Sequence, residues 1–190
     1  PMHPGFVAAI GMGHGQLHSD QINRLPYLNM MLALLRDGFH EESVGGSISL
    51  RSDGLPALDY PVNDYLRDGV RRALHTMAEI QFAAGALKVR PIHTAGRYAS
   101  TLAEVKQHID ELDLEPNRVR IGSAHVMGGC AMGEDVTMSV VNSRGKFHHL
   151  DGLHILDGSI FPTSIGANPQ LSIYGMVARA ATELGNSLAG

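Results

Sequence analysis

The chain has 190 residues, with 15 Lys and Arg against 19 Asp and Glu, and its formal net charge is −4 at neutral pH. This length corresponds to one domain or slightly more, and the mildly acidic balance argues against a dedicated nucleic-acid or anionic-membrane binder. The single cysteine, Cys130, excludes an internal disulfide framework and a cysteine-based zinc site. It fits a reducing compartment, so we expect a cytoplasmic protein. We expect no membrane-spanning segment, because the longest apolar run, Met30–Leu35, is far shorter than the roughly 18 residues that a spanning helix needs.

The first 60 residues contain two apolar runs and a hairpin signal. Phe6–Ile10 predicts a strand that runs into a glycine-rich turn, and Leu28–Leu35 predicts a strand or a buried helix. Ser47–Leu50 predicts a short strand, and the turn residues Ser52–Gly54 predict a hairpin around it.

The middle of the chain carries the two clearest helix signals. Apolar residues recur at three- and four-residue spacing between Asn63, a predicted N-cap, and Gly85, a predicted stop. Thr101–Glu104 is a capping-box pattern that predicts a helix reaching about Leu112. Between these helices, Leu87–Ile92 predicts a strand.

The last third alternates short apolar runs with glycine-rich loops. Val140-Val141 predicts a buried edge, and Leu153–Leu156 predicts a short strand. An irregular loop, Phe161–Pro169, leads into a predicted final helix, Leu171–Leu188. Short strands and helices without regular βαβ spacing predict an α+β fold, in which one end of the chain completes another sheet.

Three motifs point to chemistry only weakly. Gly11–Gly15 would need a glycine at the position of Gln16 to match the dinucleotide-binding fingerprint, so a simple turn is favoured. His148 and His149 are neighbours whose side chains would point to opposite faces of a strand, so we expect no metal site. Ser159 lacks the Gly-x-Ser-x-Gly pattern of a nucleophile elbow.

Two strings remain, over residues 123–133 and 156–171. Taken alone, His125 fits a packed core histidine better than a catalyst, and Asn168-Pro169 fits the start of a helix. Asp157 is more suggestive, because it ends a predicted strand and is followed by Gly158. Ligands of open α/β sheets bind outside the carboxyl ends of the strands.

Together the two strings, with Val140-Val141-Asn142 between them, resemble the C-terminal signature of the GMC (glucose–methanol–choline) flavin oxidoreductases. The resemblance covers residues 123–188, and residues 54–85 resemble that family's substrate domain more loosely. The resemblance implies that the chain has three parts. Residues 1–122 would be a substrate-type domain, with an antiparallel or mixed sheet flanked by helices. Residues 123–150 would carry the catalytic histidine, and residues 151–190 would be the last strand, flavin-contact loop and helix of an FAD-binding domain.

The resemblance implies an FAD-dependent oxidoreductase that converts an alcohol into a carbonyl compound by hydride transfer to flavin. His125 matches the family's base, and Asn168 matches the partner that hydrogen-bonds the substrate oxygen. Because asparagine cannot take a proton, the base assignment falls on His125. The positions matched to FAD contacts are Asp157, Gly158, Asn168, Pro169 and Gln170.

The chain departs from the family pattern by lacking the N-terminal nucleotide-binding fingerprint. We therefore expect a C-terminal fragment that is inactive alone, whose partners are an alcohol substrate and the missing N-terminal FAD-binding half. The methionine-rich region Met127–Met132 favours an apolar alcohol over a sugar. The alternative is a free-standing, non-catalytic binding or interaction domain descended from such a C-terminus.

Overall fold

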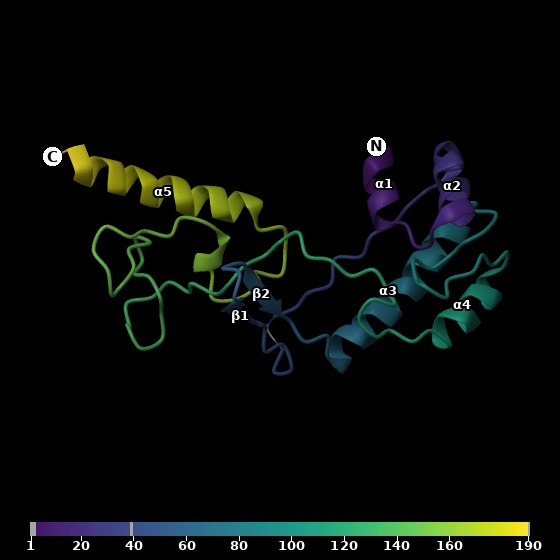
Figure 1. Cartoon of the computed structure of the whole chain (residues 1–190), viewed down its shortest axis with the longest axis horizontal. Helices are drawn as coiled ribbons and strands as arrows, with labels where there is room; N and C mark the ends of the chain where they lie inside the picture. Colours follow the sequence, from purple (N-terminus) through teal and green to yellow (C-terminus); the bar gives the residue numbers. More distant parts are fainter. Residues whose placement is uncertain (1–2, 39, 190) are drawn as a thin grey trace. The chain divides into compact units, whose positions relative to one another are not determined.

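The structure, a computed structural model, describes residues 3–38 and 40–189 (Figure 1). Its internal contacts divide the chain into two units. Unit 1 comprises Pro1–Leu35 and Ala57–Gly122, and unit 2 comprises Arg36–Pro56 and Ser123–Gly190. The assignment of these parts to a substrate-type and an FAD-type domain stays a prediction.

Unit 1 is mainly helical, and its core lies between two helices that local signals place well. The Asn63 side chain accepts a hydrogen bond from Leu66 N at 3.0 Å, which caps α3 (Asp64–Ala83) as predicted. The Thr101 hydroxyl accepts from Glu104 N while the Glu104 carboxylate accepts from Thr101 N, so the predicted capping box is confirmed at the start of α4 (Leu102–Asp110). Val105 and Ile109 of α4 pack with Ala78 of α3 in the fully buried core. The helices of unit 1 are α1 (Pro4–Ile10), α2 (Gly15–Asn23), the 3-10 turn η1 (Leu25–Tyr27), α3 (Asp64–Ala83) and α4 (Leu102–Asp110).

Two buried histidines sit beside this core. His93 is 2% exposed; its Nδ1 accepts a hydrogen bond from Ala95 N, and its Nε2 lies 2.6 Å from Asp113 O. His108 is 3% exposed and its Nε2 accepts from Arg97 N at 3.3 Å. The pKa of His108 is lowered, first because burial disfavours the charged imidazolium and then because Arg97 adds a positive charge.

Acid should therefore destabilise unit 1 through His108. The folded chain holds the imidazole neutral, whereas the unfolded chain takes up a proton as the pH falls through about 6.5. The contribution of neutral His108 to the free energy of unfolding is present above a pH of about 6.5. It is lost as the pH falls from there toward the lowered pKa of His108 in the folded chain. We expect His108→Gln, which cannot titrate, to reduce the loss of unfolding free energy between neutral and mildly acidic pH. Urea unfolding at both pH values measures this, and equal losses in the variant and the wild type would contradict it.

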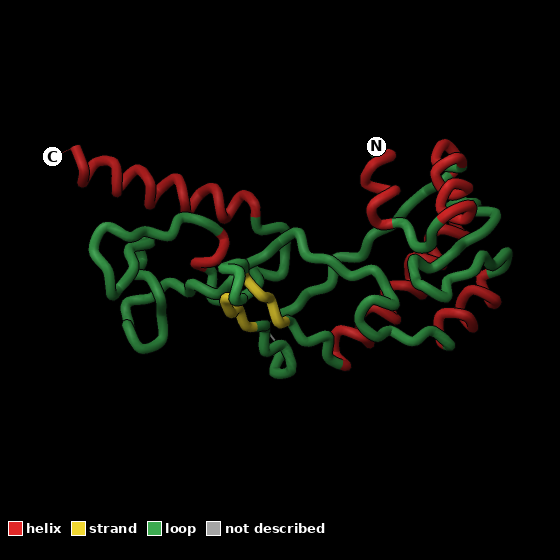
Figure 2. The backbone as a smooth tube through the Cα atoms, viewed as in Figure 1, coloured by secondary structure: helices red, strands yellow, loops and turns green. Residues whose placement is uncertain are grey.

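Unit 2 is held mostly by loops and single bridges. Figure 2 shows the long segment between α4 and α5 (Gln170–Ala189) as loop apart from one short turn of helix. Within it Val141, fully buried, bridges to both Met132 and Phe147, and Lys146 bridges to His154. Unit 2 also contains β1 (Ser47–Leu50), the 3-10 turn η2 (Gly158–Ile160) and α5, whereas β2 (Pro56–Asp59) has only its first residue in unit 2 and the rest in unit 1.

The α+β expectation is confirmed in its coarse form. The predicted hairpin is present as a two-stranded sheet of β1 and β2, and the predicted final helix is α5. The larger sheet flanked by helices is not found in the described residues, where β1 and β2 are the only named strands. No helix of the described part of the chain combines the length and apolar character needed to cross a bilayer.

Four predicted elements are corrected. Phe6–Ile10 lies in helix α1, because Pro4 stands at its first turn and the His3 side chain caps it by accepting from Gly5 N. Leu28–Leu35 is in neither a helix nor a strand. The other two, Leu87–Ile92 and Leu153–Leu156, form only single bridges, Val89 to Ala99 and His154 to Lys146, because neither segment has a neighbouring strand to extend the pairing.

Candidate functional site

The segment that carries His125 lies along η2 in unit 2. Cys130 N donates to Ser159 O at 3.0 Å, and Met132 N donates to Ile160 O at 2.8 Å. A Cβ placed on Gly158 would lie 3.1 Å from Val126 O, so the residue next to His125 touches the backbone of Gly158. The structure thus brings the predicted base segment against the predicted cofactor segment, although they are about thirty residues apart in the chain.

Asp157 is held as an ionised carboxylate at the start of η2. Its Oδ1 accepts hydrogen bonds from both the backbone N and the hydroxyl of Ser159. These bonds, the side-chain one foremost, lower the pKa of Asp157. The side chain is exposed, so this carboxylate is charged and accessible.

Helix α5 begins directly after the predicted contact residues. The carbonyl of Pro169 accepts the first helical bond from Ile173 N at 2.9 Å, and Pro169 itself is buried. Proline has no side-chain acceptor, so it cannot cap the first amides of the helix, which begins at Gln170. The first turn also reaches η2, since Ile173 Cδ1 would lie 3.0 Å from a Cβ on Gly158.

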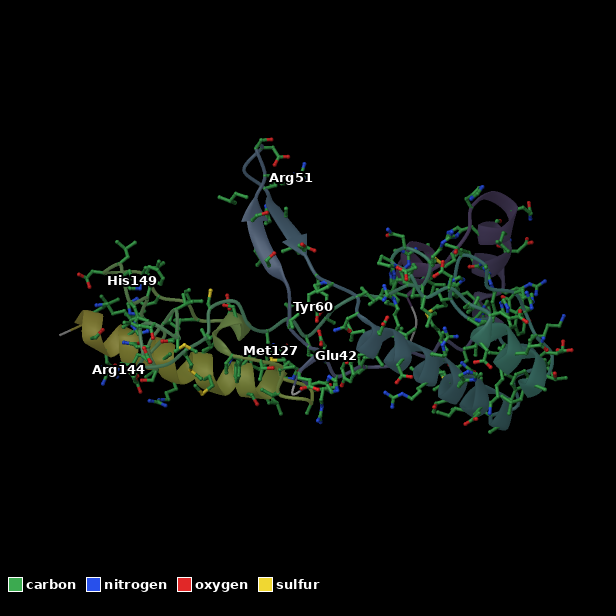
Figure 3. All side chains as sticks on the ribbon, turned by 90° about the horizontal axis from the view of Figure 1, so that it is seen from below. Glu42, Arg51, Tyr60, Met127, Arg144 and His149 are labelled. Atoms are coloured by element: carbon green, nitrogen blue, oxygen red, sulfur yellow. The ribbon has the colours of Figure 1, made fainter. Side chains whose placement is uncertain are left out.

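The two predicted catalytic side chains, His125 and Asn168, are both exposed. Within the described residues neither side chain makes a hydrogen bond, so both the imidazole and the amide are available to a ligand. Figure 3 labels Met127, two residues after His125, near the first turns of α5. Gly158 is the common contact of the His125 segment and of α5, whereas no direct bond joins His125 to Asn168.

The weaker motifs have structural partners or lie elsewhere. His148 Nε2 lies 2.9 Å from the Ser139 hydroxyl, and the His149 ring packs edge-on against Phe147. Within residues 3–38 and 40–189, no group of three His, Cys, Asp or Glu side chains is arranged to hold a metal ion. A pocket of about 260 Å³ belongs to unit 1 and includes none of the predicted site residues; it is lined by Leu17, Asp20, Gln21, Arg24, Lys88 and Tyr98.

One contact of the site was not predicted. The Arg36 guanidinium lies on the backbone of Gly166 and its Nη2 is 3.4 Å from Gly166 O. The two residues are 130 positions apart. The only sequence signal was the glycine itself, which adopts a positive φ of 72°.

Comparisons with known proteins all point to one family. A family model described as GMC oxidoreductase matches residues 42–177. Long-chain-alcohol oxidase FAO4A of Arabidopsis thaliana is 32% identical over 181 residues, which cover 90% of this chain and 24% of the relative. The 6'''-hydroxyparomomycin C oxidase of Streptomyces lividus is 29% identical, over 78% of this chain and 23% of the relative. An uncharacterized GMC-type oxidoreductase of Mycobacterium tuberculosis is 25% identical, over 95% of this chain and 27% of the relative. The chain therefore spans about a quarter of the length of the curated relatives that it matches.

Proposed function

Because this chain belongs to the GMC oxidoreductase family, we propose that it supplies the residues that take up the proton during an FAD-dependent oxidation of an alcohol to a carbonyl compound. The observation that carries the proposal is the main-chain pairing of the segment after His125 with η2, which brings the Val126 carbonyl, next to His125, against Gly158. The relatives named as alcohol oxidases support the reaction class.

His125 would act as the base. An alcohol gives up hydride readily only when its hydroxyl proton leaves at the same time, so a positioned proton acceptor is required. The exposed imidazole of His125, with no hydrogen bond to another described side chain, suits this role. Asn168 would donate its amide N–H to the substrate oxygen, which orients the hydroxyl toward His125.

The residues at η2 and α5 fit FAD by their chemistry. Asp157 presents a charged carboxylate that can accept hydrogen bonds from sugar-type hydroxyls, and the absence of a side chain at Gly158 lets Val126 and Ile173 pack close to it. Pro169 provides no side chain that could cap the amides at the start of α5. The residues from Asn168 to Gln170 therefore suit contact with the electron-rich edge of the flavin ring. When bound, FAD supplies the acceptor for the hydride; the chain supplies orientation and proton transfer.

We propose an apolar alcohol as the substrate. The half-buried side chains of Met127 and Met132 flank the segment after His125 and provide a flexible apolar surface. Two of the relatives are named as long-chain-alcohol oxidases with 32% identity, whereas the Streptomyces relative is named for an aminoglycoside. The whole activity requires an FAD-binding part that we propose precedes this chain in the full protein, as the length of its relatives suggests. A cytoplasmic location stays a prediction.

The test is anaerobic mixing of the full flavin-loaded protein with a saturated fatty alcohol. We expect the visible flavin absorbance to bleach with the fatty alcohol and to bleach more slowly with a sugar or an aminoglycoside. Bound flavin that no alcohol bleaches would contradict the proposal and would favour a non-catalytic binding domain. Faster bleaching by the aminoglycoside would contradict the apolar substrate alone.

A further inference from the structure

Arg36 covers the backbone of Gly166 with the flat face of its guanidinium. A Cβ placed on Gly166 would lie 2.8 Å from each of three guanidinium atoms, Cζ, Nε and Nη2. Three equal distances mean that the plane faces the glycine rather than touching it with one edge. Only a residue without a side chain leaves room for this contact.

The same short segment meets the loop at a second point. Gly38 is buried, and a Cβ there would lie 2.9 Å from Thr163 Oγ1 and 3.1 Å from Ser164 Cβ. The segment 36–38 therefore lies against residues 163–166 at two successive places. Both belong to unit 2.

Asn168 lies two residues after Gly166 in the same loop. Its own side chain is exposed and makes no hydrogen bond within the described residues. The stretch that carries it is anchored on one side by the buried Pro169. On the other side, Gly166 is held by Arg36 and by its own amide bond to the Ser164 hydroxyl at 3.2 Å.

We propose that Arg36 is a positioning residue that holds Asn168 in its productive place through the flat face of the guanidinium on Gly166, an inference that rests on the function proposed above. Lysine is not an equivalent, because an ammonium group on a flexible stem has no planar face to lay on a backbone. When a residue that orients the substrate is displaced by about 1 Å, the reaction rate can fall about 10²-fold.

The experiment compares Arg36→Ala and Arg36→Lys with Arg144→Ala as the matched control. Arg144 is an exposed arginine of the same unit, whose Nε lies 3.8 Å from Glu183 on α5 (Figure 3). The first readout is backbone ¹⁵N relaxation at Ala167 and Asn168 in the 190-residue chain. The second is the rate of flavin reduction by a saturating alcohol in the full flavin-loaded protein, together with the alcohol concentration for half-maximal rate and the melting temperature.

We expect both Arg36 variants to lower the order parameters of Ala167 and Asn168 from about 0.85 toward 0.6, and the control to leave them unchanged. The saturating rate should fall by up to about 10²-fold, with little change in half-maximal concentration or melting temperature. Unchanged order parameters, loosening spread over all of unit 2, or recovery by Arg36→Lys would overturn the proposal, as would local loosening with an unchanged rate. If no alcohol reduces the wild type, the proposed function fails, while the relaxation data still decide whether Arg36 holds the loop.

Discussion

Replacing His125 with alanine in the full flavin-loaded protein is expected to slow flavin reduction by an alcohol about 10²–10⁴-fold, the usual contribution of a general base. The flavin should stay bound, because the frame around His125 is made by main-chain bonds from Cys130 and Met132 to η2. Removal of an exposed side chain leaves these bonds intact. Stopped-flow absorbance under anaerobic conditions measures the rate.

His149→Ala is the matched control for this prediction. His149 is also exposed and lies in unit 2, and its ring packs against the rings of Phe147 and His148. We expect its rate of flavin reduction to stay within about twofold of the wild type. A His125→Ala protein that retains the wild-type rate would refute the base assignment, and an equal loss in both variants would point to a general disturbance of unit 2.

Replacing Gly96 with alanine is expected to lower the free energy of unfolding of unit 1 by about 3 kcal/mol or more, at the upper end for a single substitution. The new Cβ would lie 2.2 Å from Pro91 O and 3.0 Å from His93 O. Both neighbours are backbone atoms, so no side-chain rotation relieves the collision. The turn would have to open, which also strains the bond from Arg90 Nε to Gly96 O.

Gly85→Ala separates this collision from ordinary glycine strain. Gly85 follows α3 with a φ of 90°, and a Cβ there would meet nothing within 4 Å. Gly85→Ala should lower the free energy of unfolding by about 1 kcal/mol, which is the cost of placing alanine in a left-handed conformation. Urea unfolding followed by circular dichroism compares the two variants. Equal losses would show that the backbone around Gly96 yields, contrary to the expectation.

Two of the three helices that the sequence predicts correctly have complete local signals, and the third, α5, is predicted from its apolar period alone. α3 has both an apolar period and the Asn63 cap, and α4 has both halves of its capping box. The short apolar run Phe6–Ile10 has no such pair of signals in its pattern, and the helix there depends on Pro4 and on the His3 side chain before it. Periodicity over five residues does not distinguish a strand from a helix.

Strands and sites depend on distant partners, which a single sequence does not display. Leu153–Leu156 has strand-forming residues but finds only one bridge, from His154. In the same way, the motif order pointed to His125 and Asp157, whereas the main-chain bonds that bring their segments together involve carbonyls and amides that every residue has. The Arg36 contact with Gly166 spans 130 positions and carries no local pattern. The catalytic and cofactor roles of the predicted residues stay predictions.

The lone thiol of Cys130 is half-buried and forms no disulfide, and its own amide is one of the two that tie the His125 segment to η2. A nitroxide spin label attached to this thiol would therefore report on that segment without any engineered cysteine. Its spectral line width would follow the mobility of the backbone five residues from His125. The natural chain thus already contains an attachment point from which paramagnetic broadening maps the surroundings of the imidazole.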